Sequence, residues 1–155
     1  MKIKTGLIHD LYVVLAQARC VELSTEEKIN VSLAARVLKP IAVTFDGDSA
    51  DIAEKMKTSE DLFERYQKAL QYMQMTKDPL CDMSKLPMGP AENDAFWKEW
   101  GEYNRAVDKA MKPIIDKEHE LEIKKISEAT FQKLVSSNPN WTIGQIDSLG
   151  EILVE

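Results

Sequence analysis

The expected fold of this chain depends on two short stretches, Met1-Lys2-Ile3-Lys4-Thr5-Gly6 and Glu118-His119-Glu120-Leu121-Glu122-Ile123-Lys124-Lys125-Ile126. Charged and apolar side chains alternate in both of them. A period of two residues is typical of a β-strand that has one face in solvent and the other against a core. We therefore expect a strand at each place, more than a hundred residues apart along the chain.

The charges of the two stretches are complementary. Lys2 and Lys4 can lie opposite Glu120 and Glu122, and such cross-strand pairs favour pairing. Ile3 then shares the inner face with the apolar residues of the second stretch, Leu121 and Ile123. We expect the N-terminal strand to pair with the strand near 118–126 as a small antiparallel β-ribbon.

Most of the remaining sequence has apolar residues three or four positions apart, which is typical of amphipathic helices. A helix is predicted to begin after Ser24, because Ser24 and Glu27 can form a capping box. Pro40 lacks a backbone N–H, so this helix is expected to kink or end near Lys39. Ile41–Phe45 fits either a resumed helix or a short strand, and Asp46-Gly47-Asp48-Ser49 has the composition of a turn.

Two further apolar rows predict two more helical runs, and a restart of the first run as a new helix capped by Thr58 or Ser59 is an alternative. The first row is expected to be buried and contains Ile52, Met56, Phe63, Tyr66, Leu70 and Met73. The second begins near Pro90, ends at Pro113 and contains Phe96, Trp100, Tyr103, Val107 and Met111. Residues 79–90 hold three prolines and one glycine and are expected to form a mobile connection between them.

The C-terminal part predicts two short helices. Ser127 is a candidate cap for the first, and Thr142 with Gln145 forms a capping box for the second. A chain of 155 residues can bury a core of its own. We expect a single domain, 1–155, of mainly α class with a small antiparallel ribbon (α+β).

Composition excludes several classes of partner. The formal net charge is −6, and no cluster of lysine and arginine appears, so we expect neither nucleic acid nor an anionic membrane surface as a partner. No apolar run approaches the length of a bilayer crossing. Cys20 and Cys81 are isolated and lack a metal or redox spacing, and the N-terminus lacks a signal-peptide pattern, which favours a reducing cytoplasm.

The candidate contact residues lie in or near the proline-containing connection. Met73, Met75, Met83 and Met88 fall close together, and methionine adapts its shape to variable protein surfaces. Trp97 lies off the apolar row of its predicted helix and is a candidate for an exposed aromatic contact. Met75, Met83, Met88 and Trp97 are therefore the expected partner-binding residues, although filling of an irregular core is the alternative for each.

Signs of catalysis are sparse. The acidic stretch 46–51 departs from a calcium loop, because Ala50 and Lys57 stand where oxygen ligands are needed. His9, Asp10, Glu118 and His119 could meet through the ribbon and form a metal or acid–base group. The chain has no phosphate-binding loop, dinucleotide fingerprint or nucleophile elbow. We expect no catalytic residues, no metal and no cofactor, with a small metal-dependent enzyme at the two histidines as a minor alternative.

The ribbon stretches, the segment Ile8-x-x-Leu11-Tyr12-x-x-Leu15 and the closing Trp141-Thr142-Ile143-x-x-Ile146-x-x-Leu149 resemble a group of proteins encoded by bacteriophages and prophages. These are small, mostly helical proteins of unknown function. The resemblance covers both ends of the chain and excludes residues 40–95. It implies a viral origin and location in the host bacterial cytoplasm, with incorporation in the virion as an option.

We accordingly expect a non-enzymatic accessory, structural or assembly protein that acts through contacts with a protein of the virion or of the host, with self-association left open. The alternative is a phage protein that binds and inhibits a host or defence protein. Acidic side chains could then mimic nucleic acid, provided that they gather on one face. The residues concerned are Asp46, Asp48, Asp51, Glu54, Glu60, Asp61 and Glu64.

Overall fold

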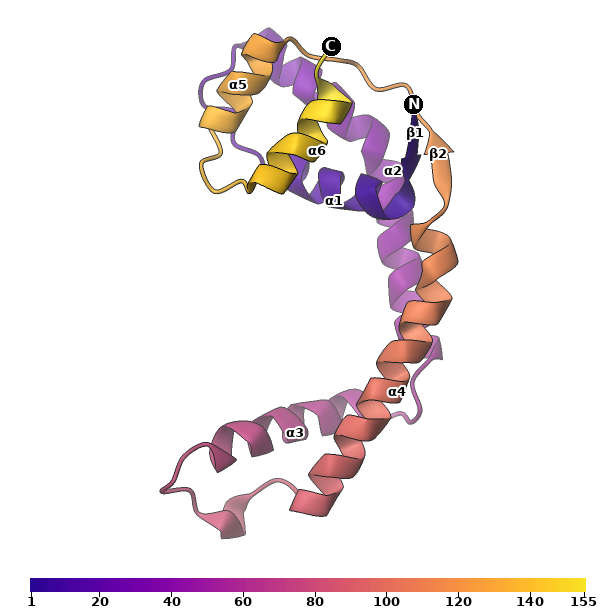
Figure 1. The fold of residues 1–155 in the computed structure, drawn as a ribbon, viewed down its shortest axis with the longest axis vertical. Coiled ribbons are helices and arrows are strands. Elements are labelled where there is room, and N and C mark those ends of the chain that lie inside the picture. Colours follow the sequence, from indigo (N-terminus) through magenta and orange to yellow (C-terminus); the bar gives the residue numbers. More distant parts are fainter. The chain divides into compact units, whose positions relative to one another are not determined.

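The structure is a computed structural model that describes residues 1–155 (Figure 1). It is mainly helical with a two-stranded antiparallel ribbon, which confirms the predicted fold class. Its contacts group into two compact units. Unit 1 comprises Met1–Asp48 with Pro113–Glu155, and unit 2 comprises Ser49–Lys112. We predicted a single domain, 1–155. That the two units unfold together as one domain stays a prediction.

The ribbon of unit 1 consists of β1 (Lys2–Lys4) and β2 (Glu118–Glu120), which lie side by side in Figure 1. Lys2 pairs with Glu120 and Lys4 with Glu118, so opposite charges face each other along the ribbon. Ile3 lies opposite His119 and is buried in the core. The predicted antiparallel pairing of the two segments is confirmed, and Ile3 lies on the buried face as predicted.

The second strand is shorter than expected, and the pairing is displaced by two residues from Glu122 and Glu120 to Glu120 and Glu118. The last bonds of the ribbon join the backbones of Met1 and Leu121, at 2.9 and 3.1 Å. The segment after Leu121 leaves the ribbon, and its Ile123 and Ile126 are buried in the core of unit 1.

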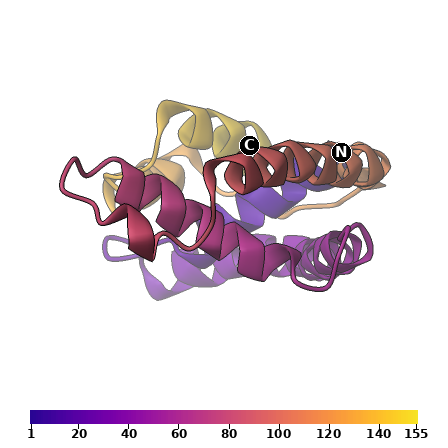
Figure 2. The ribbon, with the colours of Figure 1, turned by 90° about the horizontal axis from the view of Figure 1, so that it is seen from below.

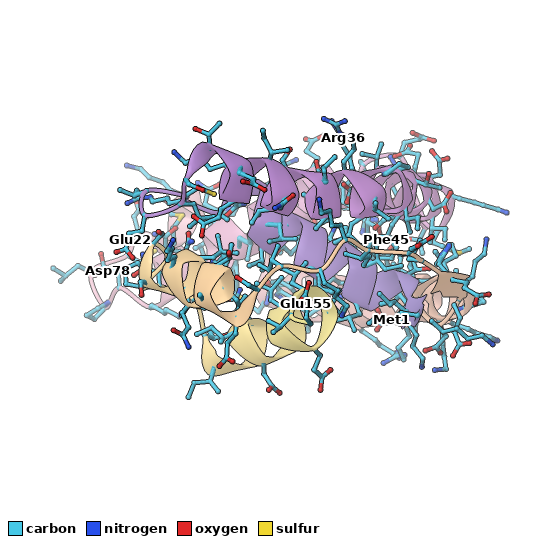
Figure 3. The ribbon with its side chains drawn as sticks, turned by 90° about the horizontal axis from the view of Figure 1, so that it is seen from above. Met1, Glu22, Arg36, Phe45, Asp78 and Glu155 are labelled. Carbon is cyan, nitrogen blue, oxygen red and sulfur yellow. The ribbon has the colours of Figure 1, made fainter.

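The core of unit 1 lies among α1 (Thr5–Ala16), the first part of α2 (Thr25–Lys55), α5 (Glu128–Ser136) and α6 (Ile143–Leu153). Apolar side chains at helical spacing fill it, including Ile8, Leu11, Leu15, Leu38, Leu134, Leu149 and Leu153. Figure 3 shows the same helices from above with their side chains. Burial of these faces supplies most of the stability that short helices lack by themselves.

Side-chain caps fix where three of these helices begin. Ser24 and Glu27 exchange hydrogen bonds at the start of α2, with distances of 2.7 and 3.3 Å. The Ser127 hydroxyl accepts from the backbone of α5, and Thr142 forms a complete capping box with Gln145 on α6. All three predicted caps are confirmed, because each depends on residues only three positions apart.

The middle of α2 decides between the alternatives left open by the sequence. The helix passes through Pro40 without ending, and Ile41–Phe45 is helical, which was one of its two options. The turn expected at Asp46–Ser49 was wrong, because these residues are helical as well. Pro40 is exposed, so the backbone near the missing hydrogen bond can be solvated. The buried residues on both sides of it, Leu38 and Ala42, keep one continuous helix against the core.

Unit 2 contains α3 (Leu62–Thr76), a short 3₁₀ helix η1 (Met83–Lys85) and most of α4 (Pro90–Ile115) (Figures 1 and 2). The α4 row is confirmed: its members are buried or half-buried, and Phe96 and Tyr103 lie in the core of this unit. Pro90 begins α4 as predicted. Pro113 does not end α4, which continues for two residues to Ile115; the proline itself is exposed.

The first predicted row was right in part: Ile52, Met56 and Tyr66 are half-buried. It was wrong for Phe63, Leu70 and Met73, which are 39%, 40% and 41% exposed, whereas Leu62 and Ala69 are fully buried. The small Ala69 side chain occupies the core position, which leaves room for the bulky aromatic side chains of α4. The buried face of α3 is therefore displaced around the helix from the face that the larger apolar residues predicted.

The connection 79–90 contains turns and η1, whose first bond is made by the Asp82 carboxylate accepting from the Ser84 backbone at 3.0 Å. Its expected mobility stays a prediction. Cys20 and Cys81 are both free thiols. None of the helices combines the length and the apolar composition that crossing a bilayer requires.

Candidate functional site

The four residues predicted to bind a partner all belong to unit 2, but they differ in accessibility. Met83, at the start of η1, is 64% exposed, and Met75, in the last turn of α3, is half-buried. Met88 is only 7% exposed and lies in the core beside Phe96. Trp97 is half-buried, and its indole N–H donates to the Asn93 side chain at 3.0 Å. Met83 is thus the most accessible of the four and Met88 the least.

Met75 lies on a shallow depression of unit 2, formed by the end of α3 and the connection that follows it. The lining also includes Leu80, which is 91% exposed, Cys81 and Lys85. Asp82 faces the same depression, and hydrogen bonds from the Ser84 hydroxyl and backbone lower the pKa of its carboxyl. Apolar side chains and a stable negative charge therefore share this surface.

An aromatic cluster joins α3 to α4. Tyr66 stacks on Trp100 with ring centroids 4.3 Å apart, and Phe63 meets Trp100 edge-on at 6.2 Å. Phe96 meets Trp97 edge-on at 5.3 Å. Such pairs add specific geometry to the burial of apolar area. These ring contacts fix α3 against α4.

Arg65 provides a second link between the two helices. Its guanidinium donates two hydrogen bonds to the Glu99 carboxylate, at 2.7 and 3.0 Å, and two more to Asp61 and Ser59, at 3.2 and 2.6 Å. Thr58 donates to Glu99 as well. Hydrogen bonding to Glu99 raises the pKa of Arg65, and the bonds from Arg65 and Thr58 lower the pKa of Glu99. Both groups stay charged, and the start of α3 is anchored to α4.

Beside its buried face α3 carries a partly exposed apolar row formed by Phe63, Leu70 and Met73, which we name the α3 row. These residues are seven and three positions apart, so they lie along one side of the helix. The sequence analysis assigned them to the core. A second apolar row of the helix has the same spacing and consists of Leu62, Ala69 and Tyr72. The helix therefore has more apolar positions than one buried face can hold, and this excess is the sequence signal that some of them stay exposed.

The two histidines take part in separate hydrogen-bonded groups of unit 1. His9 Nε2 bonds to the Asp46 carboxylate at 2.9 Å, and its ring lies 4.7 Å from that of Phe45. His119 Nε2 bonds to the Thr5 hydroxyl at 2.8 Å. No group of three or more histidine, cysteine, aspartate or glutamate side chains is arranged to hold a metal ion. The predicted group around His9 and His119 is therefore not assembled as a ligand set.

No protein-family model matches this chain, and no curated protein or solved structure matches it either.

Proposed function

We propose that this protein is a non-enzymatic accessory or assembly component that acts through protein–protein contacts made by unit 2. The observation that carries the proposal is the α3 row: three large apolar side chains stay about 40% exposed on a helix that is fixed to α4. Exposed apolar side chains that lie in a row on a rigid element are typical of contact surfaces. The exposed Met83 and Leu80 extend the apolar surface of the same unit.

A second copy of the chain is the partner that fits the α3 row best. In an antiparallel pair of α3 helices centred near Gln67 and Lys68, Phe63 of one copy would lie opposite Met73 of the other. Helices with apolar rows pack in this way by inserting side chains between those of the neighbour. The row is therefore complementary to itself, as a two-fold symmetric interface requires.

The charges at the two ends of α3 support the same arrangement. Glu60 precedes the helix and Lys77 follows it, and both are exposed. The charge of Glu60 also acts on Lys57 of the same chain. Antiparallel pairing brings Glu60 of each copy near Lys77 of the other. Since the row is narrow compared with the ~800 Å² per partner of stable complexes, we expect a weak and concentration-dependent association.

Inhibition of a host or defence protein by nucleic-acid mimicry receives less support. Three of the seven acidic residues that would form the mimic are paired with a lysine or arginine, namely Glu54, Asp61 and Glu64, and Asp46 is hydrogen-bonded to His9. Local neutralisation weakens the uniform negative surface that mimicry needs. This alternative and the phage origin both stay predictions.

Sedimentation velocity over a range of protein concentrations tests the proposal. The wild-type chain is expected to shift toward a dimer as concentration rises, and Leu70→Glu, which places a charge in the centre of the α3 row, is expected to abolish the shift. Ile143→Glu is the matched control, because Ile143 is 87% exposed and belongs to unit 1. Equal behaviour of the two variants would argue against the α3 row as a contact surface.

A charge exchange tests the antiparallel arrangement. Glu60→Lys and Lys77→Glu should each weaken the dimer, because each places like charges together, and the double variant should restore it. Failure of the double variant to recover association would exclude this pairing. A wild-type chain that stays monomeric at every concentration would exclude self-association altogether.

A further inference from the structure

A groove between α1 and α2 in unit 1 combines an apolar floor with a basic rim. Tyr12, Leu15, Val31 and Ala35 contribute to the floor, and these side chains are buried or half-buried. The rim consists of Lys28, Arg36 and Lys39, which are all exposed and all lie on α2. In Figure 3 the Arg36 side chain points away from the helices. We name this feature the basic groove.

The three basic side chains of the rim have no acidic partner within the chain. They are the only charged residues between positions 28 and 45, and none of them forms an ion pair, although the chain as a whole carries a net charge of −6. Glu27, next to Lys28 in the sequence, is already bonded to Lys133 and to the backbone of Ser24. The basic groove is therefore a local site of positive potential on an acidic protein.

The spacing of the rim defines the length of a ligand. From Lys28 to Lys39 the helix rises about 16 Å, at 1.5 Å per residue. All three side chains project from one side of α2, because their positions are eight and three residues apart. A second helix of about eleven residues lying along the groove could reach every one of them.

We propose that the basic groove binds an acidic amphipathic helix of another protein. Aspartate and glutamate of the ligand would pair with Lys28, Arg36 and Lys39, while its apolar side would cover Tyr12 and Ala35. The Tyr12 hydroxyl, which forms no hydrogen bond within the chain, would be free to donate to the ligand. Apolar contacts along a helix flanked by complementary charge are a recurrent mode of peptide recognition.

Nucleic acid fits the basic groove less well than an acidic helix does. Three phosphate contacts supply little affinity at physiological salt, and the net charge of −6 repels a long polyanion. The apolar floor also lacks exposed planar rings other than Tyr12 on which bases could stack. A short ligand with both acidic and apolar side chains uses the floor and the rim together.

Fluorescence anisotropy with a labelled acidic peptide tests this inference on the full chain. The probe is a peptide of about twelve residues with glutamate and leucine at helical spacing, and the reference peptide carries glutamine in place of every glutamate. We expect the acidic peptide alone to bind, and its affinity to fall at least tenfold in the Arg36→Glu/Lys39→Glu variant. Binding should also weaken as salt rises, since the rim is exposed.

A charge-matched control removes the effect of net charge. Lys98→Glu/Lys109→Glu alters two exposed basic residues of α4 and should leave the affinity unchanged. Circular dichroism must show that both variants are folded. The inference is overturned if the wild-type chain does not bind the acidic peptide, if both peptides bind equally, if both double variants lose affinity equally, or if a DNA duplex of similar length binds more tightly.

Discussion

The Glu27 carboxylate accepts a hydrogen bond from the Lys133 ammonium group at 2.8 Å, and this contact joins the first turn of α2 to α5. The Thr130 hydroxyl donates to the same oxygen at 3.2 Å, while the backbone of Ser24 donates to the other. The bonds from Lys133 and Ser24 are the main reasons that the pKa of Glu27 falls to about 2. A single side chain therefore caps one helix and ties it to another.

Replacement of Glu27 by glutamine should reveal the effect of this charge. Glutamine can still complete the capping box, so Glu27→Gln removes chiefly the ionic bond to Lys133. The pKa of Glu27 is lower in the folded chain than its ordinary value of 4.5, so the ionised group stabilises the fold above pH 4.5. That contribution is lost as the pH falls from 4.5 toward 2. We expect wild type to exceed the variant in urea midpoint at pH 7 and to approach it near pH 3.

Measurement at pH 7, 5, 4 and 3 by circular dichroism gives the pH profile of the difference. Lys133→Met should show the same profile, because it breaks the same bond from the other side. A difference that stays constant from pH 7 to pH 3 would show that ionisation of Glu27 does not stabilise the fold.

Gly47 provides a test of the uninterrupted α2 helix. Nothing lies within 4 Å of the position that a Cβ atom would occupy, and the residue is helical. Gly47→Ala should therefore stabilise the chain by about 0.5–1 kcal/mol, through the lower backbone entropy of alanine in the unfolded state and its higher helix propensity. Urea unfolding measures the change. If residues 46–49 formed the turn predicted from the sequence, Gly47→Ala would not increase the stability.

The comparison of sequence with structure separates local signals from tertiary ones. The ribbon and the three helix caps were predictable, because alternation and capping boxes depend on residues a few positions apart. The passage of α2 through Pro40 and Gly47 was not. It depends on Leu38 and Ala42 being buried against other helices, and such packing overrides the local preference of proline and glycine.

The candidate site illustrates the same limit. The methionine-rich segment was found from composition, yet burial of Met88 and exposure of Met83 depend on how the connection folds back on α4. The α3 row was assigned to the core because large apolar residues are the usual choice for burial. The small Ala69 is buried in that position instead, and the size of the apolar side chains alone does not predict this.

Ile3 should account for most of the stability of the ribbon. The side chain is 4% exposed and belongs to the core of unit 1, so Ile3→Ala should cost about 2–4 kcal/mol. Lys2→Ala and Lys4→Ala are the controls, and each should cost less than about 1 kcal/mol, because exposed charge pairs contribute little. Urea unfolding of the three variants decides which contribution is larger. Equal losses of stability in the three variants would show that the charge pairs stabilise the ribbon as much as the burial of Ile3 does.

Arg65 should govern the stability of unit 2. Its side chain and that of Glu99 are 27% and 29% exposed, and Arg65→Ala removes the two guanidinium hydrogen bonds to Glu99. We expect a loss of about 1–3 kcal/mol, typical of hydrogen bonds to charged groups. Arg105→Ala, at an exposed position of α4, should change stability by less than about 0.5 kcal/mol.

Hydrogen exchange on the Arg65→Ala variant also addresses the number of folding domains. Faster exchange confined to amides of residues 49–112 would show that unit 2 unfolds separately, whereas faster exchange throughout the chain would support the single domain predicted from the sequence.

Met83 and Met88 should respond oppositely in tests of stability and association. Met88 is buried in the core of unit 2, so Met88→Ala should cost about 2–4 kcal/mol in urea unfolding. Met83 is 64% exposed, so Met83→Ala should leave stability within about 0.5 kcal/mol of wild type. Its effect should instead appear as weaker self-association in sedimentation, if the apolar surface of the connection extends the α3 row. Loss of stability without loss of association in Met83→Ala would assign this methionine to packing alone.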